Sequence, residues 1–265
     1  MIKISCQEQL LPGASLQAKW DFAARAGYDA IELRGKGDFA FRDRLPELRR
    51  AARDGVPMPS VCVDMLHFIG AFDADLRRDA VAQLKSQLSV LAEIGGTVAA
   101  TPASYGMFSR RLPPFEPPRS EAEDRAVLLE ALAELGTHAA REGVTLVLEP
   151  LNRYEDHMVN RIEQAVELVD AVGLPSVRVL ADTYHMNIEE DDPTAALLKA
   201  AGHIGHVQVS DSNRFQPGAG HLDWGALLGT LDAIGYTGHL AVECRLRGEP
   251  AAAVAAIPGF LRRWS

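Results

Sequence analysis

The chain has 265 residues, close to the roughly 250 that a single α/β barrel typically takes, so we expect one domain spanning residues 1–265. Hydrophobic residues make up 47% and charged residues 24%, as in ordinary soluble globular proteins, which argues against disorder. The net charge of −9 argues against a nucleic-acid partner, because nucleic-acid binding draws most of its affinity from basic surface. A small neutral or mildly anionic molecule fits this charge better.

The cysteine pattern and the first residues of the chain indicate the cellular compartment of the protein. Cys6, Cys62 and Cys244 each lie in or at the end of a strand-like run, with no Cys-x-x-Cys pair, so we expect buried, reduced thiols of the kind that the cytoplasm maintains. The chain starts directly in a strand without a signal-like apolar region, and no apolar stretch approaches the ~20 residues needed to cross a bilayer. The sequence therefore predicts a cytoplasmic protein without a membrane partner.

The first half of the chain alternates short apolar runs with helical patterns. Ser15 can cap a helix that Gly27 ends, because a serine hydroxyl accepts from a free backbone N–H and glycine tolerates the left-handed backbone that follows a helix. Asp73 opens a longer predicted helix, which Gly95 and Gly96 break. The other predicted elements of this half are strands over residues 2–6, 28–33, 59–65 and 97–101 and a helix that includes residues 46–53.

The second half repeats this alternation. Ser120 can cap a helix that Gly143 ends, and residues 160–163 have the pattern of a capping box that opens a helix ending at Gly173. Helices are also predicted over residues 193–201 and 224–234. Four apolar, strand-like runs separate these helices, and they end near Glu149, Asp182, Gln208 and Glu243.

These segments amount to eight strands that alternate with eight helices. Each strand is a nearly continuous apolar run, as expected when helices cover both faces of a parallel sheet, and right-handed crossovers then close a barrel. The sequence therefore predicts a single (β/α)8 TIM barrel. An open doubly wound sheet is the alternative, and it is disfavoured because no Gly-x-Gly-x-x-Gly segment follows any strand.

The four strand ends of the second half all carry oxygen donors. They are spaced 33, 26 and 35 residues apart, and a strand with its crossover helix takes about 30 or more. A helix cap or a salt bridge explains any single one of them. Four on consecutive strands would converge on one barrel face, where buried carboxylates need a cation to offset their repulsion. We therefore predict a divalent metal site at Glu149, Asp182, Gln208 and Glu243, with Mn²⁺ favoured and Mg²⁺ or Co²⁺ as alternatives.

Three segments between residues 144 and 245 carry a family resemblance: Glu149-Pro-Leu-Asn-Arg-Tyr-Glu155, Asp182-Thr-Tyr-His185-Met-Asn and Gln208-Val-Ser-Asp-Ser-Asn-Arg214. They resemble the sugar phosphate isomerase/epimerase family with a xylose-isomerase-like TIM barrel, which includes ketose 3-epimerases and hydroxypyruvate isomerases. The first half of the chain resembles it only as a β/α pattern. The resemblance implies a divalent ion at the four strand-end positions. It also implies that Glu155, His185 and Arg214 contact oxygens of the substrate.

Gln208 departs from the ketose 3-epimerase pattern, which usually has a histidine there, whereas the hydroxypyruvate isomerase branch has glutamine. An amide oxygen in place of an imidazole nitrogen should preserve metal binding and narrow the metal preference. His206 is a rival ligand, because residues two apart on a strand face the same way. We rank it below Gln208, since it would lie roughly 7 Å deeper in the barrel. At that depth a histidine is more often a core residue with satisfied hydrogen bonds than a metal ligand.

The resemblance and the two opposed glutamates predict a metal-dependent isomerase or epimerase of a small sugar, similar to ketose 3-epimerases. Removing a proton beside a carbonyl requires a carboxylate base and an electrophile that holds the developing enediolate, and a metal ion supplies the second. Glu149 and Glu243 would lie on opposite sides of the ion. One could remove the proton and the other return it from the opposite face, or one could move it between carbons.

Three alternatives use other chemistry. A metal-dependent lyase or deglycosidase acting on an oxidised, 3-keto sugar would keep the same base and metal, and it is the main rival. An apurinic endonuclease would need more metal ligands and a basic groove, which the acidic charge opposes. A non-catalytic sugar-binding module would have no reason to retain two opposed carboxylates.

A long connection over residues 102–119 leaves the fourth strand on the face of the predicted site. Its five prolines exclude a helix, and its length exceeds that of most loops. Tyr105, Phe108 and Phe115 lie in this connection with no regular element to bury them. We expect it to wall the site and to set which sugar fits, or to contact a neighbouring subunit of a homo-oligomer.

Overall fold

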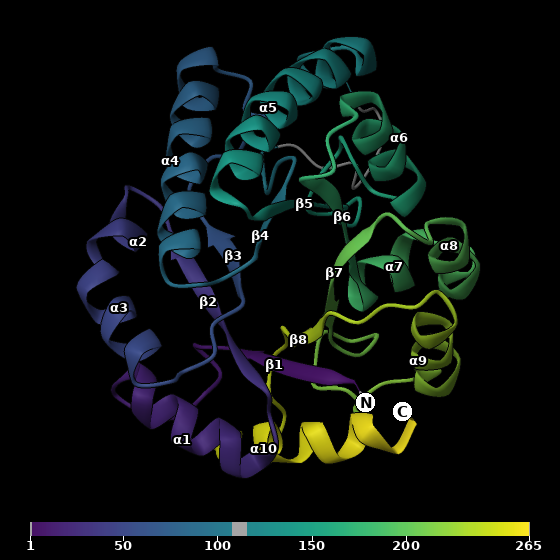
Figure 1. The fold of residues 1–265 in the computed structure, drawn as a ribbon. Helices are drawn as coiled ribbons and strands as arrows, with labels where there is room; N and C mark the ends of the chain where they lie inside the picture. The colour runs from purple at the N-terminus through teal and green to yellow at the C-terminus, as the bar shows by residue number, and fades with distance from the viewer. Residues whose placement is uncertain (1, 108–115, 265) are drawn as a thin grey trace.

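Eight parallel strands form a closed barrel in the computed structural model, which describes residues 2–107 and 116–264 (Figure 1). Each strand pairs with the next along the chain, and β1 pairs with β8 to close the ring. The predicted TIM barrel is confirmed, and the open sheet is excluded. The strands are β1 (Lys3–Gln7), β2 (Ala30–Lys36), β3 (Ser60–Asp64), β4 (Val98–Pro102), β5 (Thr145–Glu149), β6 (Val177–Asp182), β7 (Ile204–Val209) and β8 (His239–Val242).

Helices surround the barrel as an outer ring (Figure 1). Within the described residues they are α1 (Leu16–Ala26), α2 (Ala40–Asp43), α3 (Leu45–Arg53), α4 (Ala74–Glu93), α5 (Glu121–Glu142), α6 (Ile162–Val172), α7 (Thr183–Glu189), α8 (Pro193–Lys199), α9 (Trp224–Ala233), α10 (Pro250–Leu261) and the 3₁₀ turn η1 (Arg262–Trp264). None of these helices is both long and apolar enough to cross a membrane.

The predicted helix caps are confirmed except at α6, while α8 and α9 end at Lys199 and Ala233 rather than at residues 201 and 234. The side chain of Ser15 accepts from Ala18 at the start of α1, and Gly27 ends that helix with a φ of 94°. Ser120 forms a capping box at the start of α5. The capping box predicted for residues 160–163 is wrong by one position: the helix begins at Ile162, and the side chain of Gln164 accepts from the preceding backbone N–H groups. The side-chain nitrogen of Asn160 donates to the backbone carbonyls of Leu151 and Asp156.

A short helix that the sequence did not predict follows β6. No helix was predicted between Asp182 and residue 193, but α7 starts directly after the strand because Asp182 caps it, accepting from the backbone N–H of Tyr184 at 2.7 Å. The same carboxylate thus ends a strand and starts a helix. This rigid strand-to-helix turn fixes His185 relative to Asp182.

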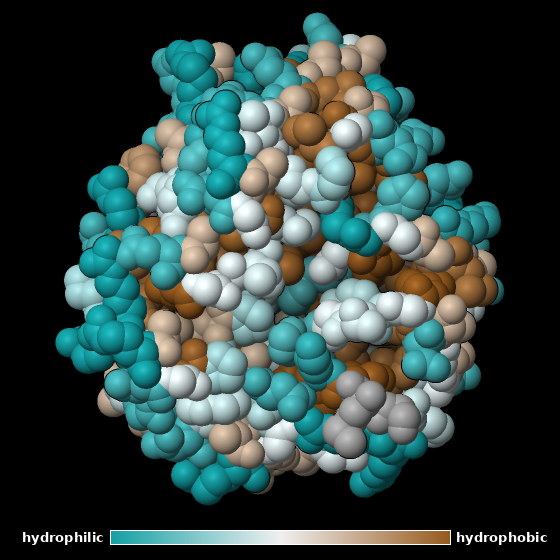
Figure 2. Space-filling model, viewed as in Figure 1, coloured by the Kyte–Doolittle hydropathy of each residue, from teal (hydrophilic) through white to brown (hydrophobic). Residues whose placement is uncertain are grey.

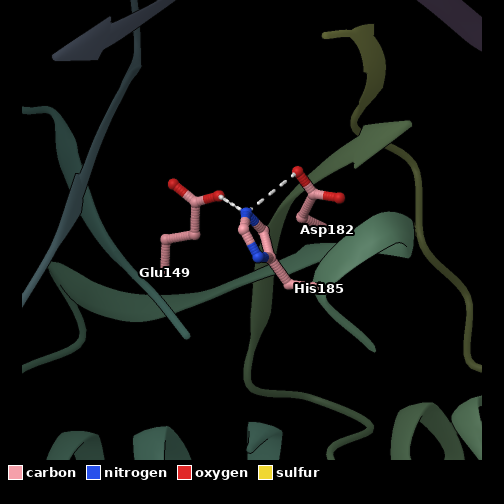
Figure 3. A group of neighbouring side chains, drawn as sticks. All are labelled: Glu149, Asp182 and His185. Atoms are coloured by element: carbon pink, nitrogen blue, oxygen red, sulfur yellow. Dashed lines mark ion pairs between the residues drawn. The ribbon is translucent and has the colours of Figure 1, made fainter. Parts of the chain in front are cut away.

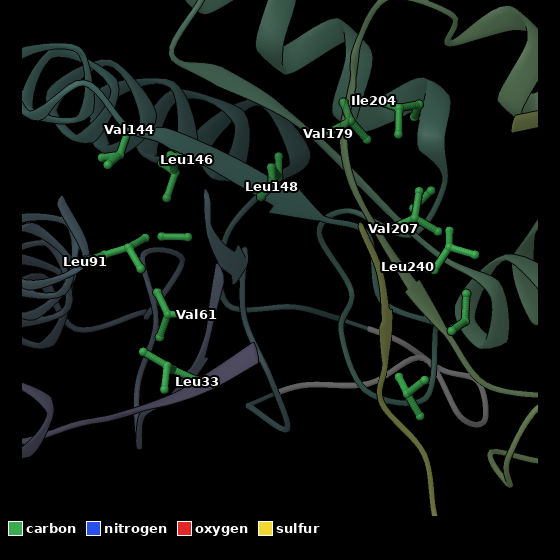
Figure 4. Close-up of a cluster of buried hydrophobic side chains, with 14 of the residues drawn as sticks. Leu33, Val61, Leu91, Val144, Leu146, Leu148, Val179, Ile204, Val207 and Leu240 are labelled. Carbon is green, nitrogen blue, oxygen red and sulfur yellow. The ribbon is translucent and has the colours of Figure 1, made fainter. Parts of the chain in front are cut away.

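The hydrophobic core has two parts. Most buried apolar side chains lie between the barrel and the helices, as Leu146 and Leu148 do on β5 (Figure 4). Each such side chain contributes about 1.5–3 kcal/mol when fully buried. A smaller, separate cluster consists of Ala100 on β4, Val147 on β5 and Leu180 on β6. Because side chains two residues apart on a strand share a face, Glu149 lies on the same face of β5 as Val147, toward the barrel interior.

The molecular surface in the orientation of Figure 1 is mostly hydrophilic over the outer helices, with hydrophobic residues visible between them (Figure 2). The three cysteines are free, and Cys6 is buried as predicted. Cys62 and Cys244 are only partly buried, contrary to the prediction, because both line a cavity at the carboxyl ends of the strands. Of the residues expected to wall the site, Tyr105 lines this cavity, whereas Phe108 and Phe115 lie outside the described residues.

Candidate active site

A cavity of about 530 Å³ opens at the carboxyl ends of the barrel strands, within the size range of small-molecule sites. Five of the predicted site residues line it: Glu149, Glu155, His185, Arg214 and Glu243. The other two, Asp182 and Gln208, are 1% and 0% exposed, and the register of β6 and β7 pairs them side by side. The barrel therefore brings all seven residues to one end of the molecule.

Glu149, Asp182 and His185 form a group of potential metal ligands among the described residues. One atom from each lies within 4.8 Å of the others. His185 Nε2 is 3.8 Å from Glu149 Oε1 and 3.9 Å from Asp182 Oδ2, between the two carboxylates (Figure 3). Glu155 lies farther out, 4.0 Å from the same nitrogen and about a third exposed.

Arg214 lies among the carboxylates rather than at the surface. Its guanidinium donates to Asp182 Oδ2 at 2.9 Å and contacts Glu243 Oε1 at 3.2 Å, and it packs over the ring of Tyr184. The backbone at Arg214 has a φ of 63°, a conformation that costs a non-glycine residue energy and that tends to occur at functional sites. Burial disfavours the charged form, but Asp182 and Glu243 outweigh this effect and raise the pKa of Arg214, which stays charged.

The two glutamates proposed as catalytic groups are held in an unfavourable environment for negative charge. Burial, followed by the charges of Glu243 and Asp182, raises the pKa of Glu149 well above its usual value. Burial also raises the pKa of Glu243 to about 7, even though the charge of Arg214 opposes it. A carboxyl group whose pKa lies near 7 can both give and take a proton at neutral pH, which is a property of general acid–base residues.

Gln208 and His206 both reach Glu32 from β7. The Gln208 amide nitrogen donates to Glu32 Oε1 at 3.0 Å, and His206 Nε2 contacts Glu32 Oε2 at 2.7 Å. His206 is therefore engaged with a buried carboxylate below the cavity, as expected for the lower-ranked ligand. The Gln208 oxygen, in contrast, is buried and has no hydrogen-bond partner in the described structure.

His185 is held in one tautomer by Asn152. The backbone N–H and the side-chain amide of Asn152 both contact His185 Nδ1, at 3.0 and 2.9 Å. Because a backbone N–H can only donate, Nδ1 must accept, and the neutral imidazole therefore carries its proton on Nε2. Burial lowers the pKa of His185, which favours this neutral form. The ring thus directs an N–H donor, not a lone pair, between Glu149 and Asp182.

The donor set fits a divalent cation. Two buried oxygens of the site, Gln208 Oε1 and Glu243 Oε2, have no partner in the described structure, and leaving such groups unsatisfied is costly. Together with Glu149 and Asp182 they offer three carboxylates and one amide, which are ligands that Mg²⁺ and Mn²⁺ prefer. His185 is unsuited to this set because its inward nitrogen is protonated.

Several residues at the site were not singled out from the sequence. Asn152 and Tyr184 lie inside the quoted segments, but nothing in their spacing indicates that they orient His185 and pack under Arg214. Glu32 could have been found, because it is a charged residue inside the apolar run of the second predicted strand.

Comparison with known proteins identifies the family. Residues 20–264 match the family described as Xylose isomerase-like TIM barrel. The chain is 37% identical over 249 residues to 3-dehydro-D-guloside 4-epimerase of Escherichia coli, covering 94% of both chains. It is 30% identical to D-psicose 3-epimerase of Agrobacterium fabrum over 83% of this chain and 76% of that protein.

Solved structures agree with the sequence matches. The crystal structure of 3-keto-D-glucoside 4-epimerase from E. coli superposes with a TM-score of 0.94 at 36% identity, covering 99% of this chain and 100% of that one. A structure of L-ribulose 3-epimerase gives a TM-score of 0.82 at 25% identity. The chain belongs to the xylose isomerase-like TIM barrel family.

Proposed function

We propose that the chain is a divalent-metal-dependent sugar epimerase that inverts a carbon next to a carbonyl group. It is an enzyme of the sugar isomerase and epimerase class, as its relatives are. The observation that carries the proposal is the pair of carboxylates Glu149 and Glu243. They come from β5 and the end of β8 and line one cavity, and the charge of Glu243 helps burial to raise the pKa of Glu149.

The residues have separate roles in this proposal. Glu149, Asp182, Gln208 and Glu243 would hold the ion, and the two unpartnered oxygens among them support this assignment. A bound divalent ion would offset the carboxylate charges and stabilise the negative charge that develops on the substrate oxygen as the neighbouring proton leaves.

Glu149 and Glu243 would exchange the proton. One carboxylate removes it from one face of the carbon while the other, protonated, returns a proton to the opposite face, so the net charge of the site does not change. His185 would donate its Nε2 proton as a hydrogen bond to a substrate oxygen, Glu155 would accept from a hydroxyl group, and Arg214 would contribute any N–H that its two carboxylates leave free.

The favoured substrate is a keto sugar carried as a glycoside, with a free ketose as the second candidate. The relative covering 94% of both chains is named a guloside 4-epimerase, whereas the ketose 3-epimerase match is weaker and shorter. The cavity extends past the carboxylates to Tyr105 on the long connection after β4, and this supports a role for that connection in sugar choice. The lyase or deglycosidase alternative has no specific observation in its favour.

A substrate panel tests this proposal. The protein with Mn²⁺ should be incubated with 3-keto glycosides, free ketoses and aldoses, and the configuration of each product determined by NMR. We expect inversion next to the carbonyl of a keto glycoside with the glycosidic bond intact. Release of the aglycone would instead identify a lyase or deglycosidase, and aldose–ketose interconversion would identify an isomerase.

We also propose the remaining properties of the protein. Residues 1–265 would form one domain, since the barrel uses strands from both ends of the chain. Mn²⁺ is the preferred ion, and the free cysteines support a cytoplasmic location. Three exposed apolar side chains, Leu66, Tyr105 and Tyr154, follow three successive strands on the face of the cavity, and they support a homo-oligomer that buries them.

A further inference from the structure

Glu32 is a buried carboxylate at the centre of the barrel with no assigned role. It is 0% exposed, and each of its oxygens accepts two hydrogen bonds. The donors come from three other strands: Gln7 Nε2 at 3.2 Å and Gln208 Nε2 at 3.0 Å on Oε1, and Ser60 Oγ at 2.8 Å and His206 Nε2 at 2.7 Å on Oε2. A carboxylate with this many donors in a dry environment is fixed in position.

The contact with Glu32 decides which end of the Gln208 amide points toward Glu32 and which points away from it. A carboxylate can only accept, so the end of the Gln208 amide that meets Glu32 has to be the nitrogen. The oxygen is then directed away from Glu32, and it is the atom that is buried without a partner. The reverse orientation would place two oxygens against each other and leave the buried N–H group unsatisfied.

We propose that Glu32 is a positioning residue for the metal site, holding the Gln208 amide with its oxygen toward the ion before any ion binds. The inference rests on the proposed function, because it assumes that Gln208 is a ligand. An unrestrained glutamine could turn either its amide oxygen or its amide nitrogen toward the ion, and only the oxygen can bind it. The contact with Glu32 removes this choice. Ser60 and His206 hold the far oxygen of Glu32 and so keep the carboxylate from turning away.

The test is a double-mutant cycle with the Mn²⁺ dissociation constant as readout, measured by the signal of free Mn²⁺ in electron paramagnetic resonance. Glu32→Gln should weaken Mn²⁺ binding by about 10- to 100-fold, the usual effect of losing a residue that orients a ligand. Gln208→Ala should also weaken it. In the Gln208→Ala background, adding Glu32→Gln should cost little more, because the residue through which Glu32 acts is already absent.

The cycle separates the two claims. If Gln208→Ala binds Mn²⁺ like the wild type, then Gln208 is not a ligand and the proposed metal site is wrong at that position. If Gln208→Ala weakens binding but Glu32→Gln does not, only the positioning role is overturned. The positioning role is also overturned if Glu32→Gln changes the logarithm of the Mn²⁺ dissociation constant in the Gln208→Ala background by more than half as much as in the wild type. Such a result would mean that Glu32 acts by long-range charge attraction, which is present in both backgrounds. Glu163→Gln, which makes the same change at an exposed glutamate on α6, is the matched control and should bind Mn²⁺ as the wild type does.

A second measurement is made on the wild-type protein and does not require Glu32→Gln to fold. In the wild-type protein without metal, one side-chain amide proton of Gln208 should resonate downfield because it donates to a carboxylate, with the assignment made from its loss in Gln208→Ala. Addition of diamagnetic Mg²⁺ should leave that proton downfield. An ordinary chemical shift that moves downfield only when Mg²⁺ is added would mean that the ion, not Glu32, orients the amide.

Discussion

Arg214 donates to Asp182 at 2.9 Å, and its second nitrogen lies 3.2 Å from Glu243, so one guanidinium spans two of the carboxylates assigned to metal binding. Asp182 is fully buried, whereas Arg214 and Glu243 are each about a quarter exposed. In the protein without a bound ion, Arg214 therefore supplies the positive charge that offsets these two carboxylates.

Replacing Arg214 should make the protein depend on metal for stability. Arg214→Met removes the cation but keeps the side-chain length, and we expect the metal-free protein to lose about 3 kcal/mol, the cost of leaving a buried charge without its partner. Mn²⁺ should recover most of this loss. Chemical denaturation with chelator and with Mn²⁺ measures both values.

The matched control is Arg34→Met, which breaks an ion pair with Asp64 whose two side chains are both about two-fifths exposed. Such pairs contribute about 0–1 kcal/mol. Equal losses for the two variants, or a loss in Arg214→Met that Mn²⁺ does not reduce, would contradict the assigned role of Arg214.

The stabilisation by metal should depend on pH because of Glu243. Burial is the main reason that the pKa of this residue is raised from 4.5 to about 7. A raised carboxyl pKa means that the folded state holds more protons than the unfolded state between these values. This group therefore lowers the stability of the metal-free protein as pH rises from about 4.5 to about 7. A bound cation removes that penalty. The gain in melting temperature on adding Mn²⁺ should accordingly increase from about pH 5 to about pH 7, and a gain that is constant or largest at low pH would refute this explanation.

Glu149→Gln and Glu243→Gln should each slow proton exchange with substrate by about 10²- to 10⁴-fold, because an amide keeps the shape and an oxygen donor but is not a base. The readout is the rate at which solvent hydrogen enters the substrate at saturating Mn²⁺. Glu163→Gln, an exposed glutamate on α6, is the control and should exchange normally. A variant of either site glutamate with near wild-type exchange would lose its place in the catalytic pair.

His185→Ala should separate substrate contact from metal binding. Since Asn152 makes Nδ1 an acceptor, Nε2 carries the proton and cannot bind an ion. We expect kcat to fall about 100-fold or more, as for loss of one donor to a developing negative charge, while the Mn²⁺ dissociation constant stays the same. A dissociation constant that rises along with the loss of activity would make His185 a ligand instead.

The fold could be predicted because its signals are local. The ends of β5 and β6 agree with the sequence prediction, since a carboxylate ends each apolar run. The short helix α7 was missed because its cap, Asp182, had been assigned only to the metal site. At α6 the position of the cap was wrong by one residue, and the contacts of Asn160 with the backbone carbonyls of Leu151 and Asp156 are not revealed by sequence spacing.

The placement of the candidate site could be predicted, but its contacts could not. Glu149, Asp182, Gln208 and Glu243 lie at the carboxyl ends of consecutive strands, and a closed barrel brings these ends to one face. The position of Arg214 depends on a loop that turns through a positive φ, and the orientation of Gln208 depends on Glu32, which lies 176 residues away along the chain. Neither contact leaves a periodic pattern in the sequence.

Incorporation of deuterium tests the central claim most directly. The protein should be incubated in D₂O with a 3-keto glycoside, once with Mn²⁺ and once with chelator, and the substrate and its epimer examined by NMR and mass spectrometry. We predict one deuterium at the carbon beside the carbonyl, in product formed only with Mn²⁺ and with the glycosidic bond intact. Epimerisation that proceeds without deuterium uptake, or at the same rate after the metal is removed, would contradict metal-dependent proton transfer by Glu149 and Glu243.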